Sequence, residues 1–94
     1  MKTISYAGNK FLTGDAIANA LLEISQLMAE RRNALNVEIP VRSSDGSIRA
    51  AVFLVGPASQ IVAEDADSWD YEELIDREAL HRLTELKRRL QSAR

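Results

Sequence analysis

The chain has 94 residues, no cysteine and a formal net charge of -2. Its length fits a single small domain spanning residues 1–94, and the lack of cysteine excludes disulfides, thiol nucleophiles and cysteine-ligated metals. The charge gives no general attraction to nucleic acid, and the sequence contains neither a signal-peptide pattern nor an apolar run of membrane-spanning length. We therefore expect a cytoplasmic protein that carries no cofactor and no metal.

The first predicted helix runs from about Thr13 to Leu35. Thr13 is a residue type that caps helix N-termini, and Asp15 adds negative charge to the first turn. Asn36 is expected to end the helix in the left-handed conformation. Whether residues 3–6 form a short additional strand stays open. One helical face is apolar and contains Ile17, Ala20, Leu21, Ile24, Leu27, Met28 and Leu35.

The next segment predicts a β-hairpin with its turn at Asp45-Gly46, which is a strong turn signal. Its second strand, residues 48–55, is apolar on both faces, which is typical of a central strand covered on both sides. We expect the buried face of the hairpin to contain Val37, Ile39, Val41, Ile48, Ala50, Val52 and Leu54.

The sheet is predicted to be a three-stranded antiparallel meander. Pro40 cannot donate a backbone hydrogen bond, so residues 37–42 are expected to form an edge strand. Residues 60–64 are short and β-branched, and we expect them to pair with the other side of residues 48–55.

A second helix is predicted from about Tyr71 to Gln91, with Asp70 as N-cap and Glu73 completing a capping box. Its apolar face contains Tyr71, Ile75, Ala79, Leu83, Leu86 and Leu90. The expected fold is therefore α+β: an N-terminal helix, the three-stranded meander and a C-terminal helix.

Two sets of residues suggest ion binding and are better explained by their positions at helix ends. The acidic segment 64–73 begins like a calcium loop but lacks its glycine and its final glutamate, and acids at a helix start complement the helix dipole. The basic residues of the C-terminal helix are distributed around its circumference, as expected for cations at a helix C-terminus. They are Arg82, Lys87, Arg88, Arg89 and Arg94.

No catalytic motif is present, and the single histidine, His81, is expected on the polar side of its helix. Two amphipathic helices and a strand with two apolar faces offer more hydrophobic surface than a thin core hides. The leading hypothesis is thus a non-enzymatic protein-interaction module that forms a homodimer. The expected interface residues are Phe53, Trp69, Leu83, Leu86 and Leu90.

Two alternatives stay open. The first is a small ligand-binding protein or enzyme with a cleft near Thr13 and Asp15 and near Ser59 and Gln60. The second is a nucleic-acid accessory protein that uses the basic C-terminal helix.

Overall fold

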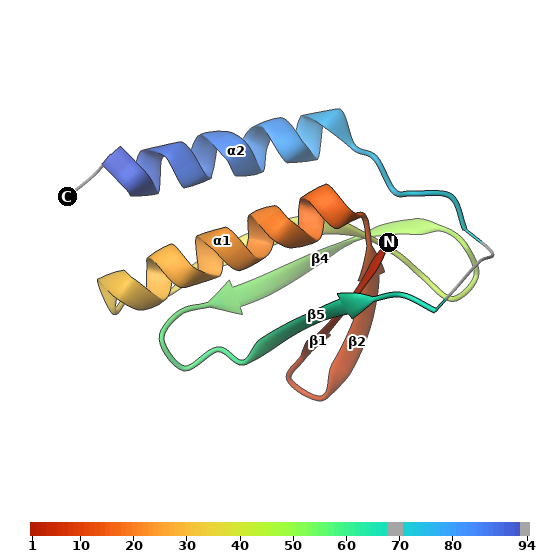
Figure 1. Ribbon diagram of the computed structural model, residues 1–94, viewed down its shortest axis with the longest axis horizontal. Coiled ribbons are helices and arrows are strands. Elements are labelled where there is room, and N and C mark those ends of the chain that lie inside the picture. Colours follow the sequence, from red (N-terminus) through yellow and green to blue (C-terminus); the bar gives the residue numbers. More distant parts are fainter. Residues whose placement is uncertain (68–70, 93–94) are drawn as a thin grey trace.

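The computed structural model describes residues 1–67 and 71–92, and it confirms an α+β fold built from one sheet and two helices (Figure 1). The elements in chain order are β1 (Lys2–Tyr6), β2 (Asn9–Thr13), α1 (Asp15–Arg31), β3 (Leu35–Arg42), β4 (Ile48–Val55), β5 (Ile61–Asp65) and α2 (Arg77–Ser92). The helices lie side by side, and the β1–β2 hairpin projects away from them.

The sheet has five antiparallel strands in the order β4-β3-β2-β1-β5. The additional strand at residues 3–6 is confirmed as part of β1, but the three-stranded meander is wrong. β5 pairs with β1, with Ile4 opposite Ala63, and not with β4. The reason is the N-terminal hairpin, whose two-residue turn at Ala7 and Gly8 has φ values of 51° and 81°.

The predicted hairpin is present, but β4 presents the opposite face to the core. Val37 lies opposite Phe53 and Ile39 lies opposite Ala51, so the buried side of β4 contains Ala51, Phe53 and Val55. Val52 is 61% exposed, contrary to the expectation that it is buried. The turn explains why the other face of β4 is buried. Gly46 takes a φ of 88° in a three-residue loop, which is closed by a hydrogen bond from the Ser43 N–H to the Ser47 carbonyl.

β4, and not β3, is the edge strand of this pair. On the other side of β3 the pairing is nevertheless sparse, as expected for a strand that contains Pro40. Here β3 pairs with β2 only at Arg42 opposite Leu12. Along the rest of that side of β3, side chains donate the hydrogen bonds that a neighbouring strand would otherwise supply. The Thr13 hydroxyl donates to the Pro40 carbonyl at 2.7 Å, and Arg82 donates to the Glu38 carbonyl at 2.7 Å.

Helix α1 begins at Asp15, with Gly14 and not Thr13 as its N-cap. Thr13 is instead the buried last residue of β2. The helix ends at Arg31, four residues before the predicted end, because Arg32 turns into the left-handed conformation at φ 55°. There the N–H of Arg32 bonds to the Ala29 carbonyl and that of Asn33 to the Met28 carbonyl, which forms a Schellman-type end.

We expect Arg32→Gly to raise the free energy of unfolding by about 0.5 to 1 kcal/mol, because glycine adopts a positive φ without a Cβ penalty and this gain exceeds its entropic cost. Arg32→Ala is the matched control, since it removes the side chain but keeps the Cβ. Urea unfolding followed by circular dichroism compares the two variants. Equal stability of both would contradict the left-handed end.

Helix α2 begins at Arg77, six residues after the predicted start, and Asp76 accepts from the Ala79 N–H at 3.0 Å. The predicted cap, Asp70, lies outside the described residues. Tyr71 and Glu73 precede the helix because they make contacts elsewhere. The Tyr71 hydroxyl donates to the Ser44 carbonyl, and its ring lies 5.2 Å from the guanidinium of Arg42.

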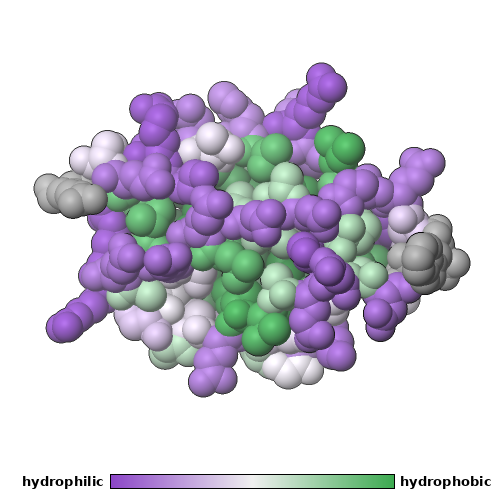
Figure 2. Space-filling view, in the orientation of Figure 1, coloured by the Kyte–Doolittle hydropathy of each residue, from purple (hydrophilic) through white to green (hydrophobic). Residues whose placement is uncertain are grey.

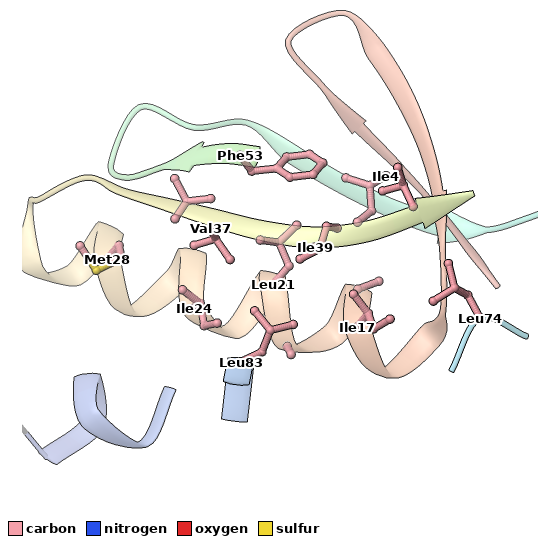
Figure 3. Packing of buried hydrophobic residues seen from close by; sticks show 14 residues of the cluster. Ile4, Ile17, Leu21, Ile24, Met28, Val37, Ile39, Phe53, Leu74 and Leu83 are labelled. Atoms are coloured by element: carbon pink, nitrogen blue, oxygen red, sulfur yellow. The ribbon is translucent and has the colours of Figure 1, made fainter. Parts of the chain in front are cut away.

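The core lies between the sheet and α1, and α2 covers it from the other side of α1 (Figure 3). Leu21 and Ile24 of α1 meet Val37 and Ile39 of β3, while Leu83 of α2 points toward α1. The two helices run in the same direction, because Lys87 bonds to Glu23 and Arg31 donates to the Leu90 carbonyl. The predicted apolar face of α1 is confirmed from Ile17 to Met28, whereas Leu35 belongs to β3. In α2 the predicted face holds from Ala79 to Leu90, but Tyr71 and Ile75 precede the helix and Ile75 is 76% exposed.

Candidate interaction surface

The outward side of β4 is an exposed apolar surface. Ile48, Val52 and Leu54 are 50%, 61% and 55% exposed, and Ala50 between them is exposed as well. These four residues alternate along the strand, so their side chains share one face of the sheet. Large apolar side chains gathered on one exposed strand mark a candidate contact surface.

The backbone along the same residues has its own unpaired side. The Ser43 N–H bonds to the Ser47 carbonyl at 2.8 Å, so these two residues form a hydrogen-bonded pair. Hydrogen-bonded and non-hydrogen-bonded pairs alternate along an antiparallel ladder, so this bond determines which residues of β4 bond to β3. The N–H and C=O groups of Ile48, Ala50, Val52 and Leu54 consequently point away from β3. Proline at position 40, opposite Ala50, agrees with this phase because a ladder bond is not needed there.

One outward group of β4 is already occupied. The Leu54 carbonyl accepts from the Tyr6 hydroxyl at 2.5 Å and from the Ser59 hydroxyl at 3.0 Å. Ser59 also accepts from the Gly56 N–H, so the turn after β4 is held against the strand end. No hydrogen bond from the described part of the chain reaches the outward groups of Ala50 or Val52.

A hollow of about 600 Å³ lies beside this strand end. Its lining includes Tyr6, Leu54, Ser59, Gln60 and Val62, and it contains no charged residue among those described. Of its three hydroxyl groups, those of Tyr6 and Ser59 are used in the bonds to Leu54, and the third belongs to Ser5. The hollow therefore suits an uncharged, mainly apolar group and offers little for acid or base catalysis.

The structure separates the two halves of the predicted cleft. Ser59 and Gln60 line the hollow near Tyr6, at the C-terminal end of β1. Thr13 lies opposite Lys2, at the other end of β1, and is fully buried. Asp15 lies at that end too, in contact with the Met1 amino group at 3.0 Å.

The cluster around Asp15 caps a helix. Glu73 accepts from the Asp15 N–H at 2.5 Å and from the Met1 amino group at 2.6 Å. The Met1 amino group donates to Glu73 and to Asp15, and these two bonds, in that order of size, raise its pKa. Glu73 was predicted to cap the second helix, and it instead satisfies a free N–H at the start of the first.

Two predicted interface residues are enclosed within the chain. Phe53 is 1% exposed and Leu83 is 0% exposed, so neither has surface to give to a partner in this fold. Leu86 and Leu90 are half-buried against the core, and Trp69 lies outside the described residues. The exposed apolar residues of β4 were expected in the core, so reasoning from the sequence missed them as a surface.

Three basic residues of α2 are engaged with acceptors. Lys87 bonds to Glu23 at 2.5 Å and Arg88 to Glu85 at 2.6 Å, and this hydrogen bond lowers the pKa of Glu85. Arg82 is held by the Glu38 carbonyl, and Arg94 lies outside the described residues. Arg82, Lys87 and Arg88 are therefore held by acceptors of the chain itself.

The acidic segment gives no metal centre in the described residues. Asp65 bonds to Lys2, which lowers the pKa of that carboxyl group, and Glu73 is occupied at the start of α1. Across residues 1–67 and 71–92, no group of three or more His, Cys, Asp or Glu side chains could hold a metal ion. His81 is exposed on α2, as predicted.

The face of the molecule drawn in Figure 2 is mixed. Figure 2 shows hydrophilic side chains around the outline of one face and a hydrophobic area in its lower centre. Neither of the two helices, as far as they are described, combines the length and apolar character needed to cross a membrane.

Comparison of the chain with protein-family models, curated proteins and solved structures gives no match.

Proposed function

We propose that this chain is a non-enzymatic protein-interaction module that associates with itself through the outward side of β4. The observation that carries the proposal is the exposure of Ile48, Val52 and Leu54 on one strand that has a single neighbour in the sheet. Exposed apolar residues on an edge strand are costly to leave in water and favour association.

The protections that edge strands usually carry are weak on β4. Natural edges are blocked by proline, by outward charges or by a covering element. β4 contains no proline, and its single charged residue, Arg49, lies on the inner side opposite Val41. Within residues 1–67 and 71–92, hydrogen bonds cover only the Leu54 end of the edge, through Tyr6 and Ser59. The remainder is therefore open to another strand.

The area available favours a reversible complex. A standard specific interface buries about 800 Å² on each partner, which is roughly an eighth of the accessible surface of 6265 Å². One strand side and its flanking side chains supply less contact area than a full helix face would. We accordingly expect dissociation in the micromolar range, where smaller interfaces are found.

Sedimentation equilibrium between about 1 and 200 μM tests the proposal, and we expect the mass to rise from monomer to dimer across that range. Val52→Glu should keep the protein monomeric, because it places a charge in the contact. Val62→Glu is the matched control: Val62 is 52% exposed on the other edge strand, β5, and its substitution should leave the dimer intact. A wild-type mass of 10.5 kDa at every concentration would contradict self-association.

The hollow beside Leu54 supports one second candidate, a binding site for a small uncharged ligand. Its volume of about 600 Å³ lies within the usual range for ligand pockets, and its lining is neutral. Native mass spectrometry of freshly purified protein would show a retained ligand as added mass on the monomer or dimer. Such a mass, without dimer formation, would favour this candidate over the interaction module.

A further inference from the structure

We infer that the second copy binds by pairing its own β4 with β4, antiparallel, about a twofold axis at Ala50. This inference rests on the proposed self-association and specifies its geometry. It joins two five-stranded sheets into one continuous sheet, with the two β4 strands at the centre.

The backbone determines which residues can take part. Only Ile48, Ala50, Val52 and Leu54 direct their N–H and C=O groups toward the open edge, as the Ser43–Ser47 bond establishes. The Leu54 carbonyl is already an acceptor for Tyr6 and Ser59. Three residues, Ile48, Ala50 and Val52, are therefore available with both groups.

A register centred on Ala50 is the one that uses all three. It places Ala50 opposite Ala50 of the second copy, and Ile48 opposite Val52 of the second copy, twice by symmetry. Centring on Ala51 or Val52 would bring in the occupied Leu54 carbonyl. Centring on Arg49 would set two like charges directly opposite each other, which is unfavourable.

The side chains fit the same register. On the outward face, Ile48 and Val52 are β-branched residues that pair well across strands, and the small Ala50 side chains meet at the axis. Both are among the exposed apolar residues of the chain, so pairing removes apolar area from water. The interface is isologous, which closes the assembly at two copies.

Single-cysteine variants test the register cleanly because the chain has no cysteine of its own. Ala50→Cys should form a disulfide-linked dimer under mild oxidation, since directly opposed, hydrogen-bonded residues have Cα atoms about 5.5 Å apart. Val52→Cys should not link to itself, because the two sites would lie about 14 Å apart. Mixing Ile48→Cys with Val52→Cys should give the linked heterodimer.

Ala50→Pro provides a second test that does not rely on oxidation. The N–H it removes points away from β3, so the β3–β4 ladder stays intact and the monomer should melt as the wild type does. The dimer should be lost, because the central hydrogen-bonded pair cannot form. A contact made only by side chains of the outward face would survive this substitution.

The outcomes separate this inference from the proposed function. Self-linking of Val52→Cys, or failure of Ala50→Cys to link in a protein shown to be dimeric, would overturn the register while leaving self-association in place. A dimer that persists in Ala50→Pro would overturn edge pairing in the same way. A wild-type protein that stays monomeric up to 200 μM would overturn both.

Discussion

Replacing Phe53 with alanine is expected to lower the free energy of unfolding by about 3 to 5 kcal/mol. Phe53 is 1% exposed, and its ring meets those of Tyr6 and Phe11 edge-on at 5.3 and 5.0 Å. The truncation would leave a cavity where β4 packs against the N-terminal hairpin. A chain of this length has about 5 to 14 kcal/mol of stability in total, so urea unfolding should show a large shift in midpoint.

The neighbouring residue supplies the control. Val52→Asp places a charge on the exposed face, and in dilute monomer it should change stability by no more than about 0.5 kcal/mol. The sequence pattern predicts the reverse, namely that Val52→Asp destroys cooperative unfolding. Wild-type-like melting of Phe53→Ala together with collapse of Val52→Asp would show that the two faces of β4 are exchanged.

The difficulty with β4 has a definite physical source. Binary patterning determines which face of a strand is buried only when the other face is polar. Residues 48–55 are apolar on both sides, so either face satisfies the pattern, and the loop geometry at Gly46 decides between them. The apolar residues left outside then form the candidate surface. Their exposure could not be read from the sequence for the same reason that the register could not.

The partner of β5 illustrates a second limit. The sequence predicts a strand at residues 60–64 paired with β4, and the strand that forms, residues 61–65, pairs instead with β1, about sixty positions away in the chain. Strand order depends on which edges are available in three dimensions, and the local pattern does not contain that information. The N-terminal hairpin supplies the edge, and its turn signal is weak because Ala7 takes a positive φ that asparagine or glycine would favour.

The apolar face of α1 agrees with the sequence pattern, whereas the starts of both helices do not. The apolar stripe of α1 reflects the 3.6-residue period and needs no knowledge of the tertiary structure, so Ile17, Leu21 and Ile24 are buried as expected. Caps depend on single hydrogen bonds. Glu73 matches a capping box by spacing, but its carboxylate bonds across the molecule to the start of the other helix. Local spacing cannot distinguish these two partners.

The start of α1 therefore offers the second large effect. Gly14→Ala should lower the free energy of unfolding by about 2 to 4 kcal/mol, by overpacking and by loss of a capping bond. The backbone of Gly14 is ordinary, with φ at -72°, so conformation alone does not require glycine. A Cβ atom there would overlap the Leu74 carbonyl oxygen and lie 3.2 Å from the Glu73 carboxylate.

Gly8→Ala is the control that separates crowding from backbone strain. Gly8 has a φ of 81°, but a Cβ there meets nothing within 4 Å, so its cost should be about 1 kcal/mol and arise from conformation. Gly14→Ala should also speed amide exchange at Asp15, because displacing the segment before α2 removes the bond from Glu73. If Gly14→Ala costs no more than Gly8→Ala and leaves that amide protected, residues 73 and 74 do not pack on the helix start.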